Sequence, residues 1–456
     1  MTAYTNYYFI GIGGIGMSAI ARYFKHRGCA VSGYDRTPSD LTAALEAEGI
    51  SVHYQDDPSA IPADIAHTLV IYTPAIPEDL GEMIFVRSHG YALCKRSKAL
   101  GEIARGQECL AISGTHGKTT TSTLLAHILT AAKEGCNAFL GGISKNYNTN
   151  LLLSDKPVLV AEADEFDRSF LQLHPHIAVI TATDADHLDI YHDHAQVVEA
   201  FGQFAAQVDA AADGGVLLVK AGVDVPLEKV SARVLHYAYD TPCEFYASDI
   251  TPLPGGRFDF TLNHPGGRLE HCTVGIPGWV NVENAVAAAA VALLHGTAPK
   301  NVRMALKSFA GVRRRFDIHV NTPRVAYVDD YAHHPNEIRA AISSLRNIFP
   351  GRKICGIFQP HLYTRTRDFA DDFAEALGLL DSLILLPIYP AREEPIPGVD
   401  AGMILDRVPI ADKVLVLKEQ LMETLRSRDI DCLVTIGAGD VDRFIEPIET
   451  YLKSLA

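Results

Sequence analysis

The chain has 456 residues and a formal net charge of −15, so it is long enough for two to four domains and lacks the basic excess of a general nucleic-acid or membrane-surface binder. Apolar residues make up 48% of it, yet no apolar run approaches the roughly 18 residues that a membrane-spanning helix needs. The eight cysteines are scattered without a C-x-x-C pair and no secretion signal is visible, so we expect a cytoplasmic protein without membrane insertion or structural zinc.

The N-terminal section begins with a predicted strand at 7–10, a glycine loop at 11–16 and a helix that ends near Gly28. A second strand at 30–34 ends at Asp35, nineteen residues beyond the last glycine of the loop. A glycine loop at a helix N-terminus binds a pyrophosphate, and an acid at this distance would meet a ribose hydroxyl. By itself this pattern favours a dinucleotide-dependent oxidoreductase. The residues expected to contact the nucleotide are Gly11, Gly13, Gly14, Ile15, Gly16 and Asp35.

A second glycine loop, SGTHGKTTT at 113–121, lies between an apolar segment at 109–112 and a predicted helix at 118–132. Strand, glycine loop, Lys-Thr and helix is the arrangement that cradles a nucleotide triphosphate. Lys118 would reach the β and γ phosphates, and the Thr119 hydroxyl would hold Mg²⁺. The loop is shorter than the general pattern because Ile112 stands where the first glycine is expected, and a plain glycine turn is the alternative. The expected ATP contacts are Gly114, Thr115, His116, Gly117, Lys118, Thr119 and Thr120.

The rest of the chain alternates predicted strands and helices, which indicates parallel sheets. Around 214–275, short alternating segments with Pro-Gly-Gly turns predict antiparallel hairpins. We therefore predict an α/β protein of three domains: a Rossmann-like parallel-sheet domain (1–107), a central P-loop ATPase-type α/β domain with an added hairpin region (108–312) and a C-terminal Rossmann-like α/β domain (313–456).

Two nucleotide loops in one chain change the interpretation of the first loop. An enzyme with a pyrophosphate loop for its substrate and a triphosphate loop for ATP explains both. A dehydrogenase leaves the ATP loop without a purpose. An oxidoreductase with a regulatory ATP domain remains as an alternative from another class.

Ten motifs follow one another along the chain: GIGGIGMSAIAR (11–22), SGTHGKTTT (113–121), EADEFDRSF (162–170), DADHLD (184–189), NVENAVAAAA (281–290), RRRFD (313–317), DDYAHHPNE (329–337), FQPHLYTRTRD (358–368), YPAREEPIPGV (389–399) and GAGD (437–440). Together they resemble the Mur ligases of peptidoglycan synthesis, and the resemblance covers all three sections.

The resemblance implies an ATP-dependent, amide-forming ligase. In this family the first section binds the UDP of UDP-N-acetylmuramate, the middle section binds MgATP and the third closes over both. The muramoyl carboxylate becomes an acyl phosphate, the amine of L-alanine attacks it, and ADP and phosphate leave. ATP and Mg²⁺ are then the cofactors, the partners are small molecules rather than nucleic acid, and the protein is a monomer or homodimer. A sister ligase that adds a preformed peptide to the same substrate is the nearest rival. A catalytically inactive UDP-sugar-binding module is an alternative from another class.

The resemblance also implies roles for residues around the middle section. Glu162, at the end of the predicted strand 158–161, would bind Mg²⁺ together with Thr119, although a solvated acid is the alternative. His187 would approach a second Mg²⁺, directly or through metal-bound water, and would be catalytic. A transition-metal site with His192 and His194 is a weaker reading. Asn281 would recognise adenine.

In the third section the resemblance places the basic pair Arg314 and Arg315 at the hinge, facing the phosphates, with Arg314 as the ATP contact. A structural ion pair is the alternative for one of the two. His333 and His334 would lie near the alanine and the muramoyl carboxylate, with His334 as a catalytic residue, although paired histidines before Pro335 can simply cap a helix. His361 and Arg365 would bind the UDP-substrate, and Arg365 would be catalytic; a surface arginine is the alternative.

Two positions depart from the family pattern. Val280 stands where a histidine often precedes Asn281, and Leu362 stands where an arginine often follows His361. One anion contact is therefore missing, and Arg365 or Arg367 would carry more of that role.

Overall fold

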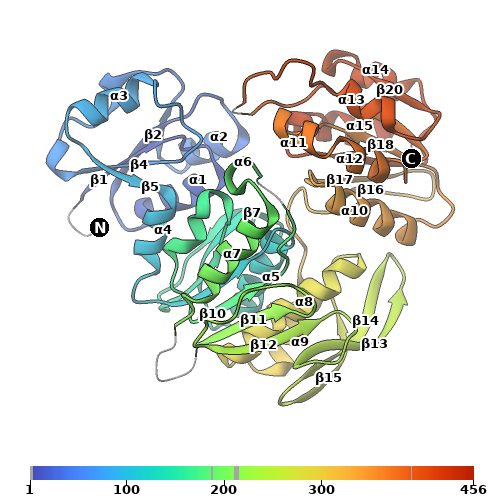
Figure 1. Cartoon of the computed structure of the whole chain (residues 1–456), viewed down its shortest axis with the longest axis horizontal. Helices are drawn as coiled ribbons and strands as arrows, with labels where there is room; N and C mark the ends of the chain where they lie inside the picture. The colour runs from blue at the N-terminus through green and yellow to red at the C-terminus, as the bar shows by residue number, and fades with distance from the viewer. Residues whose placement is uncertain (1–3, 186–187, 210–214, 392, 456) are drawn as a thin grey trace. The chain divides into compact units, whose positions relative to one another are not determined.

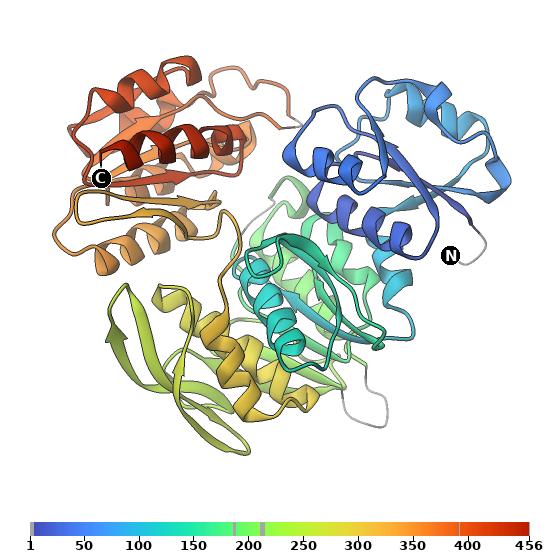
Figure 2. The same cartoon turned by 180° about the vertical axis from the view of Figure 1, so that it is seen from behind.

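The structure is a computed structural model that describes residues 4–185, 188–209, 215–391 and 393–455 (Figure 1 and Figure 2). Its contacts divide the chain into two compact units. The first unit contains residues 1–250, 260–274 and 283–310, and the second contains 251–259, 275–282 and 311–456. Among the described residues, no helix is both long enough and apolar enough to cross a membrane.

The N-terminal part is a five-stranded parallel sheet in the order β3-β2-β1-β4-β5, as the alternating pattern predicted. Alternate residues of β1 serve opposite faces: Tyr7 and Phe9 pack in the cluster of α1 and α4, and Tyr8 and Ile10 pack in that of α3. The elements are β1 (Asn6–Ile10), α1 (Ile15–His26), β2 (Ala30–Tyr34), α2 (Asp40–Ala47), β3 (Ser51–His53), the 3₁₀ turns Pro58–Ala60 and Ile65–His67, β4 (Thr68–Tyr72), α3 (Gly81–Ser88), β5 (Ala92–Lys95) and α4 (Arg96–Ala104).

The central part is built on a ten-stranded sheet in the order β15-β14-β13-β12-β11-β10-β6-β9-β7-β8. Its elements are β6 (Glu108–Ser113), α5 (Lys118–Ala131), β7 (Asn137–Ser144), β8 (Thr149–Leu152), β9 (Val158–Glu162), the 3₁₀ segment Phe166–Gln172, β10 (Ile177–Ile180), α6 (Leu188–Tyr191), α7 (His194–Ala205), β11 (Val216–Lys220), β12 (Arg233–Ala238), β13 (Phe245–Leu253), β14 (Arg257–His264), β15 (Gly267–Thr273), α8 (Trp279–His295) and α9 (Pro299–Ser308).

The hairpin region is narrower than the sequence pattern suggested. β11 and β12 pair in parallel with their neighbours, and β12 pairs in parallel with the first residues of β13. Within residues 215–275, only β13, β14 and β15 are consecutive neighbours joined by short turns. Alternation along a half-covered parallel strand cannot be told from alternation along a hairpin strand, which explains the overextended prediction.

The first helix of the N-terminal part is fixed to the central part inside the first unit. Asn150 of β8 is fully buried, and its amide donates to the backbone oxygen of Ile15 at 2.6 Å and to the Ser18 hydroxyl at 3.0 Å. The Arg22 guanidinium donates to the Asn150 side-chain oxygen at 2.5 Å. The helix that follows the first glycine loop is thus held by the sheet that carries the second.

The C-terminal part is a six-stranded sheet in the order β16-β17-β21-β18-β19-β20, with only the β16–β17 pair antiparallel. Hydrophobic clusters cover both faces, since Val328 packs with α10 and α12 while Tyr327 packs with α14 and α15. The elements are β16 (Asp317–Asn321), β17 (Ala326–Asp330), α10 (Pro335–Ile348), β18 (Ile354–Phe358), α11 (Tyr363–Asp368), α12 (Ala370–Leu377), β19 (Ser382–Leu385), α13 (Gly402–Arg407), β20 (Lys413–Leu415), the 3₁₀ turn Lys418–Gln420, α14 (Leu421–Arg426), β21 (Cys432–Ile436), the 3₁₀ turn Asp440–Phe444 and α15 (Ile445–Ser454).

Candidate active site

The second glycine loop joins β6 to α5 and needs glycine at two places. Gly114 has φ +129 and Gly117, the residue before α5, has φ +80. A Cβ added to Gly114 would lie 2.0 Å from the Thr181 hydroxyl, so no side chain fits there. The loop therefore has the left-handed backbone and the close packing expected of a phosphate cradle at a helix N-terminus.

Lys118 opens α5 and is already held by hydrogen bonds. Its ammonium donates to the Gly114 carbonyl at 2.8 Å and to the two carboxylate oxygens of Glu165 at 2.8 and 2.9 Å. The side chains of Lys118 and Glu165 are 13% and 2% exposed. Burial opposes the charge, but Glu165 and neighbouring carboxylates outweigh it, so the pKa of the Lys118 ammonium is raised. Sequence reasoning missed Glu165, since only the fold brings it to Lys118.

Thr119 and Glu162, the two expected Mg²⁺ ligands, lie together. The Thr119 hydroxyl donates to Oε1 of Glu162 at 3.2 Å. Glu162 is the last residue of β9, and a Cβ on Gly141 would lie 2.2 Å from its Oε2, so the glycine leaves space for the carboxylate. A hydroxyl and a carboxylate are hard oxygen donors, which fit Mg²⁺ completed by water and phosphate oxygens. Within the described ranges no cluster of three or more His, Cys, Asp or Glu side chains is placed to bind a metal.

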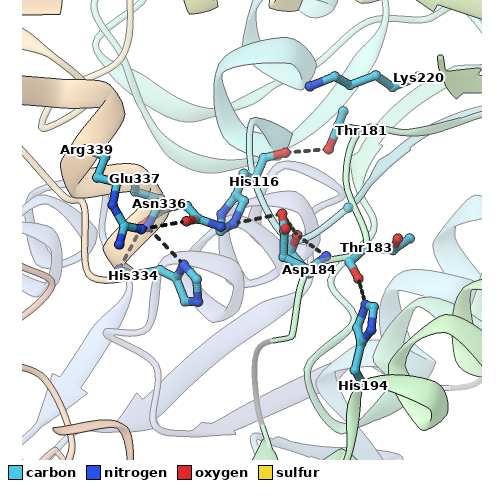
Figure 3. A network of polar contacts seen from close by, with 12 residues as sticks. His116, Thr181, Thr183, Asp184, His194, Lys220, His334, Asn336, Glu337 and Arg339 are labelled. Carbon is cyan, nitrogen blue, oxygen red and sulfur yellow. Dashed lines mark hydrogen bonds and ion pairs between the residues drawn. The ribbon is translucent and has the colours of Figure 1, made fainter. Parts of the chain in front are cut away.

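His187, the third expected metal ligand, lies outside the described residues, so its role stays a prediction. Nearby, the His194 ring donates to the carbonyl of Thr183 at 2.7 Å (Figure 3). This hydrogen bond gives the His194 ring a structural role.

His116 and Thr115 are held by Asp184, a residue that the sequence analysis did not select. Nε2 of His116 lies 3.3 Å from Oδ2 of Asp184 (Figure 3). The Asp184 backbone N–H donates to the Thr115 hydroxyl at 3.2 Å. The Thr181 hydroxyl donates to the His116 carbonyl. The segment after β10 therefore supports the side of the loop opposite α5. Thr120, also expected to contact ATP, is buried in the first turn of that helix.

Two asparagines of α8 have different surroundings. Asn281 donates its amide to the Pro277 carbonyl at 2.6 Å within the second unit, and its adenine role stays a prediction. Asn284, in the first unit, accepts from the Thr121 hydroxyl at 3.3 Å, and a Cβ on Gly117 would lie 2.8 Å from its Oδ1. Asn284 thus borders the phosphate loop. The spacing of three residues in NVEN, which puts both amides on one helix face, is the signal that could have found it.

The first glycine loop is tied to Asp35 by its backbone. Gly13 N–H donates to Oδ2 of Asp35 at 2.8 Å, and Thr37 N–H donates to Oδ1 at 3.1 Å. Gly11 has φ +86, and Gly14 precedes α1 without any side-chain cap, followed by Ile15 and Gly16 in its first turn. Asp35 therefore shapes the loop, and its predicted ribose contact would add to that role.

His334 is the N-cap of α10, as the capping alternative proposed. Glu337 accepts from the backbone N–H groups of His333 and His334 at 3.0 and 3.3 Å. Nδ1 of His334 accepts from Asn336 N–H at 3.3 Å (Figure 3). In the neutral ring the proton therefore sits on Nε2, which leaves no lone pair there to accept another proton.

His333 has the opposite tautomer. Its Nδ1 lies 3.1 Å from the Tyr331 carbonyl, which can only accept, so the neutral ring is protonated at Nδ1 and Nε2 keeps its lone pair. His333 is 6.2 Å, centroid to centroid, from His361. Of the two histidines, the geometry favours His333 over His334 as a proton acceptor.

Arg314 is engaged by groups of its own unit. Its guanidinium lies 3.2 Å from Asp329 and 3.3 Å from Asp442, and donates to the Gly437 carbonyl at 2.7 Å. Burial raises the pKa of the Asp329 carboxyl, and Arg314 opposes that rise. The structural-pair alternative thus describes the contacts of Arg314, and its phosphate role stays a prediction. Arg315 stacks over the Tyr331 ring at 4.8 Å.

His361 and Arg365 lie beside one another after β18. Arg365 is 6% exposed, which contradicts the surface-arginine alternative, and its Nη1 lies 3.5 Å from Nδ1 of His361. His361 stacks on Tyr389 at 5.8 Å. Leu362, which follows His361 in the sequence, is buried and has φ +71. L-residues rarely adopt this backbone conformation, and it is concentrated at functional sites.

Models of three protein-family domains match the chain in order: "Mur ligase family, catalytic domain" at 6–108, "Mur ligase middle domain" at 112–292 and "Mur ligase, glutamate ligase domain" at 314–439. The UDP-N-acetylmuramate–L-alanine ligase of Porphyromonas gingivalis is 49% identical over 98% of this chain and 99% of its own. That of Cytophaga hutchinsonii is 44% identical over 97% of this chain and 96% of its own.

Solved structures agree with these sequence matches. The crystal structure of a UDP-N-acetylmuramate-alanine ligase from Thermotoga maritima superposes with a TM-score of 0.82 at 27% identity, covering 98% of this chain and 99% of that one. A murein peptide ligase from Psychrobacter arcticus gives 0.74 at 21% identity, covering 98% of each chain, which shows the fold alone. The family models cover most of the chain and its relatives match it nearly end to end, so this chain belongs to the Mur ligase family.

Proposed function

We propose that this protein joins L-alanine to the carboxylate of UDP-N-acetylmuramate, with ATP cleaved to ADP and phosphate. The observation that carries the proposal is the end-to-end match, at 49% identity, to relatives named for that reaction. The murein peptide ligase, which stands for the rival reading, is matched by fold alone at 21% identity. Peptidoglycan precursor synthesis in the cytoplasm is the setting that this reaction implies.

The reaction needs two anions, the carboxylate and the γ-phosphate, to meet, so cations and positioning do most of the work. The carboxylate oxygen attacks the γ-phosphorus and ADP leaves. The alanine amine then attacks the acyl carbon and phosphate leaves. Lys118 is the cation aimed at the loop of 114–117, and it would exchange Glu165 for phosphate oxygens.

Thr119 and Glu162 would hold Mg²⁺. When bound, the ion would neutralise phosphate charge as the acyl phosphate forms. Their 3.2 Å hydrogen bond keeps both oxygens at one place before any ion arrives.

We also propose His333, rather than His334, as the group that accepts a proton from the alanine ammonium. Its Nδ1–H is directed to the Tyr331 carbonyl, which orients the ring and leaves Nε2 basic. His361 and Arg365 would bind the substrate carboxylate or phosphate beside it, and the buried guanidinium suits a planar oxyanion.

A phosphate-release assay with ATP, Mg²⁺ and UDP-N-acetylmuramate, adding amino acids one at a time, tests the proposal. We expect release to depend on all three and to be fastest with L-alanine. Release with a tripeptide but not with L-alanine would identify the sister ligase. Tight NADH binding with no response to UDP-sugars would identify an oxidoreductase.

A further inference from the structure

Arg96 lies between the two glycine loops. It is the first residue of α4, directly after β5, and its side chain rests against the first turn of α1. A Cβ added to Gly16 would lie 2.9 Å from Nη1 of Arg96 and 3.2 Å from its Cδ. The last glycine of the first loop is therefore the residue that makes room for this guanidinium.

Among the described residues, the Arg96 guanidinium has few polar partners for a side chain that is mostly buried. Its side chain is 20% exposed, and its one ion pair among the described residues is to Asp164, with Nη2 3.7 Å from Oδ2, beyond ordinary hydrogen-bond length. No hydrogen bond of the Arg96 side chain is found within the described ranges, although a guanidinium has five N–H donors. Arg22 and Arg314, by contrast, each hydrogen-bond to a carboxylate and at least one further oxygen.

A small cavity adjoins Arg96 on the side of the central part. Arg96 and Ser97 line it from α4, and Glu162 and Asp164 line it from the segment that ends β9. It has room for about one water molecule. One wall is therefore the carboxylate expected to hold Mg²⁺, and another is the arginine that touches the first loop.

The start of α4 itself offers no carboxylate to Arg96. The first turn of α4 carries no acidic residue, and Lys95 precedes Arg96 in the sequence. Asp164 is the counter-ion nearest to the guanidinium, and at 3.7 Å an incoming phosphate or carboxylate at hydrogen-bond length would outcompete it.

We propose that Arg96 binds an oxyanion of the UDP-substrate, either its diphosphate or its muramoyl carboxylate. The inference rests on the proposed function, because that reaction requires a substrate anchored at the first loop to reach the phosphate held at the second. Arg96 spans that gap: one side contacts Gly16, and the other borders Glu162.

Calorimetric titration of the full-length protein tests this with three probes: UDP, UDP-N-acetylglucosamine, which lacks the carboxylate, and UDP-N-acetylmuramate. Arg96→Met removes the charge, and Lys98→Met on the same helix, where the side chain is exposed, is the matched control. We expect Arg96→Met to weaken binding about tenfold or more, as loss of a charge-assisted hydrogen bond does, and Lys98→Met to stay within about twofold. Loss for all three probes assigns the contact to the diphosphate, and loss for the muramate alone assigns it to the carboxylate.

Asp164→Asn separates ligand binding from a purely structural ion pair. If Arg96 serves the substrate, neutralising Asp164 leaves affinity unchanged or tighter. Equal melting-temperature losses in Arg96→Met and Asp164→Asn, with wild-type affinities, would overturn the inference. If Arg96→Met does not fold, the test is Arg96→Lys, which keeps the positive charge but loses the forked hydrogen-bonding geometry of the guanidinium. We expect Arg96→Lys to weaken affinity at least threefold, and unchanged affinity would overturn the inference. Failure of the wild type to bind any UDP compound would refute the proposed function itself.

Discussion

Replacing Lys118 by Met tests the phosphate loop most directly. The ammonium makes three hydrogen bonds at 2.8–2.9 Å, to Gly114 and to both oxygens of Glu165. If it transfers to the phosphates of ATP, its loss resembles loss of one preorganised donor to a developing charge, which costs about 10²–10³ in kcat, or about 2.7–4 kcal/mol. UDP-N-acetylmuramate affinity should stay near the wild-type value, because the ammonium lies in the other loop.

The same substitution has a second effect that must be separated from the first. It leaves Glu165, whose side chain is 2% exposed, as a buried carboxylate without its ammonium partner, and breaking a buried pair from one side costs about 3–5 kcal/mol. The double variant Lys118→Met/Glu165→Gln removes both charges. We expect it to regain most of the melting temperature but none of the turnover.

Phosphate release, thermal denaturation and calorimetric binding of UDP-N-acetylmuramate measure the three quantities on the same samples. Turnover that returns together with stability in the double variant would show that Lys118 acts only as a structural ion, and the phosphate-loop assignment would be refuted. If the folded single variant no longer bound UDP-N-acetylmuramate, the assignment of Lys118 to ATP rather than to the UDP-substrate would be wrong.

Three further expectations follow from local geometry. Gly114→Ala should remove at least about 90% of ATP-dependent turnover, because its Cβ would collide with Thr181 and Ala182, directly after β10. Gly106→Ala, which also has a left-handed φ but open space around it, should retain turnover, and equal activity of the two variants would contradict the packing argument. Glu82 is fully buried, and burial raises its pKa to about 7. The folded state therefore keeps a proton that the unfolded state loses, and wild-type stability should fall as pH rises from about 4.5 to 7. Glu82→Gln should make the melting temperature independent of pH over that window, and an unchanged slope would exclude Glu82 as the cause. His333→Gln should lower kcat at least tenfold more than His334→Gln in phosphate release at pH 7–9, whereas the reverse order would restore His334 as the base.

Much of the fold was predictable because local signals agreed. The predicted strand at 30–34 matches β2 residue for residue, and the predicted strands at 7–10 and 158–161 are each one residue shorter than β1 and β9. Short apolar runs ended by glycine or acid are strong boundaries when both faces of a parallel strand are buried. The antiparallel edge strand β16 was not anticipated, since it is short and follows the RRRFD motif without an apolar run.

The site was predictable only where a motif carries its own geometry. Lys118 and Thr119 follow from the loop, and Glu162 follows from the end of a strand. Glu165, Asp184 and Arg96 could not be found in this way, because each acquires its place from a partner that is distant in the sequence. The roles of the paired histidines depend on which ring nitrogen meets a carbonyl or an N–H, and no spacing rule encodes that difference.

If Lys118 binds the phosphates of ATP, its pairing with Glu165 would make nucleotide binding an exchange of one counter-ion for another. The measured affinity for ATP is then the difference between two ion pairs, so added salt, which screens both, changes it less than it would for an exposed cationic loop. A loop already neutralised from within also has little attraction for stray inorganic phosphate. Such a loop would favour a complete nucleotide, which makes further contacts, over phosphate alone.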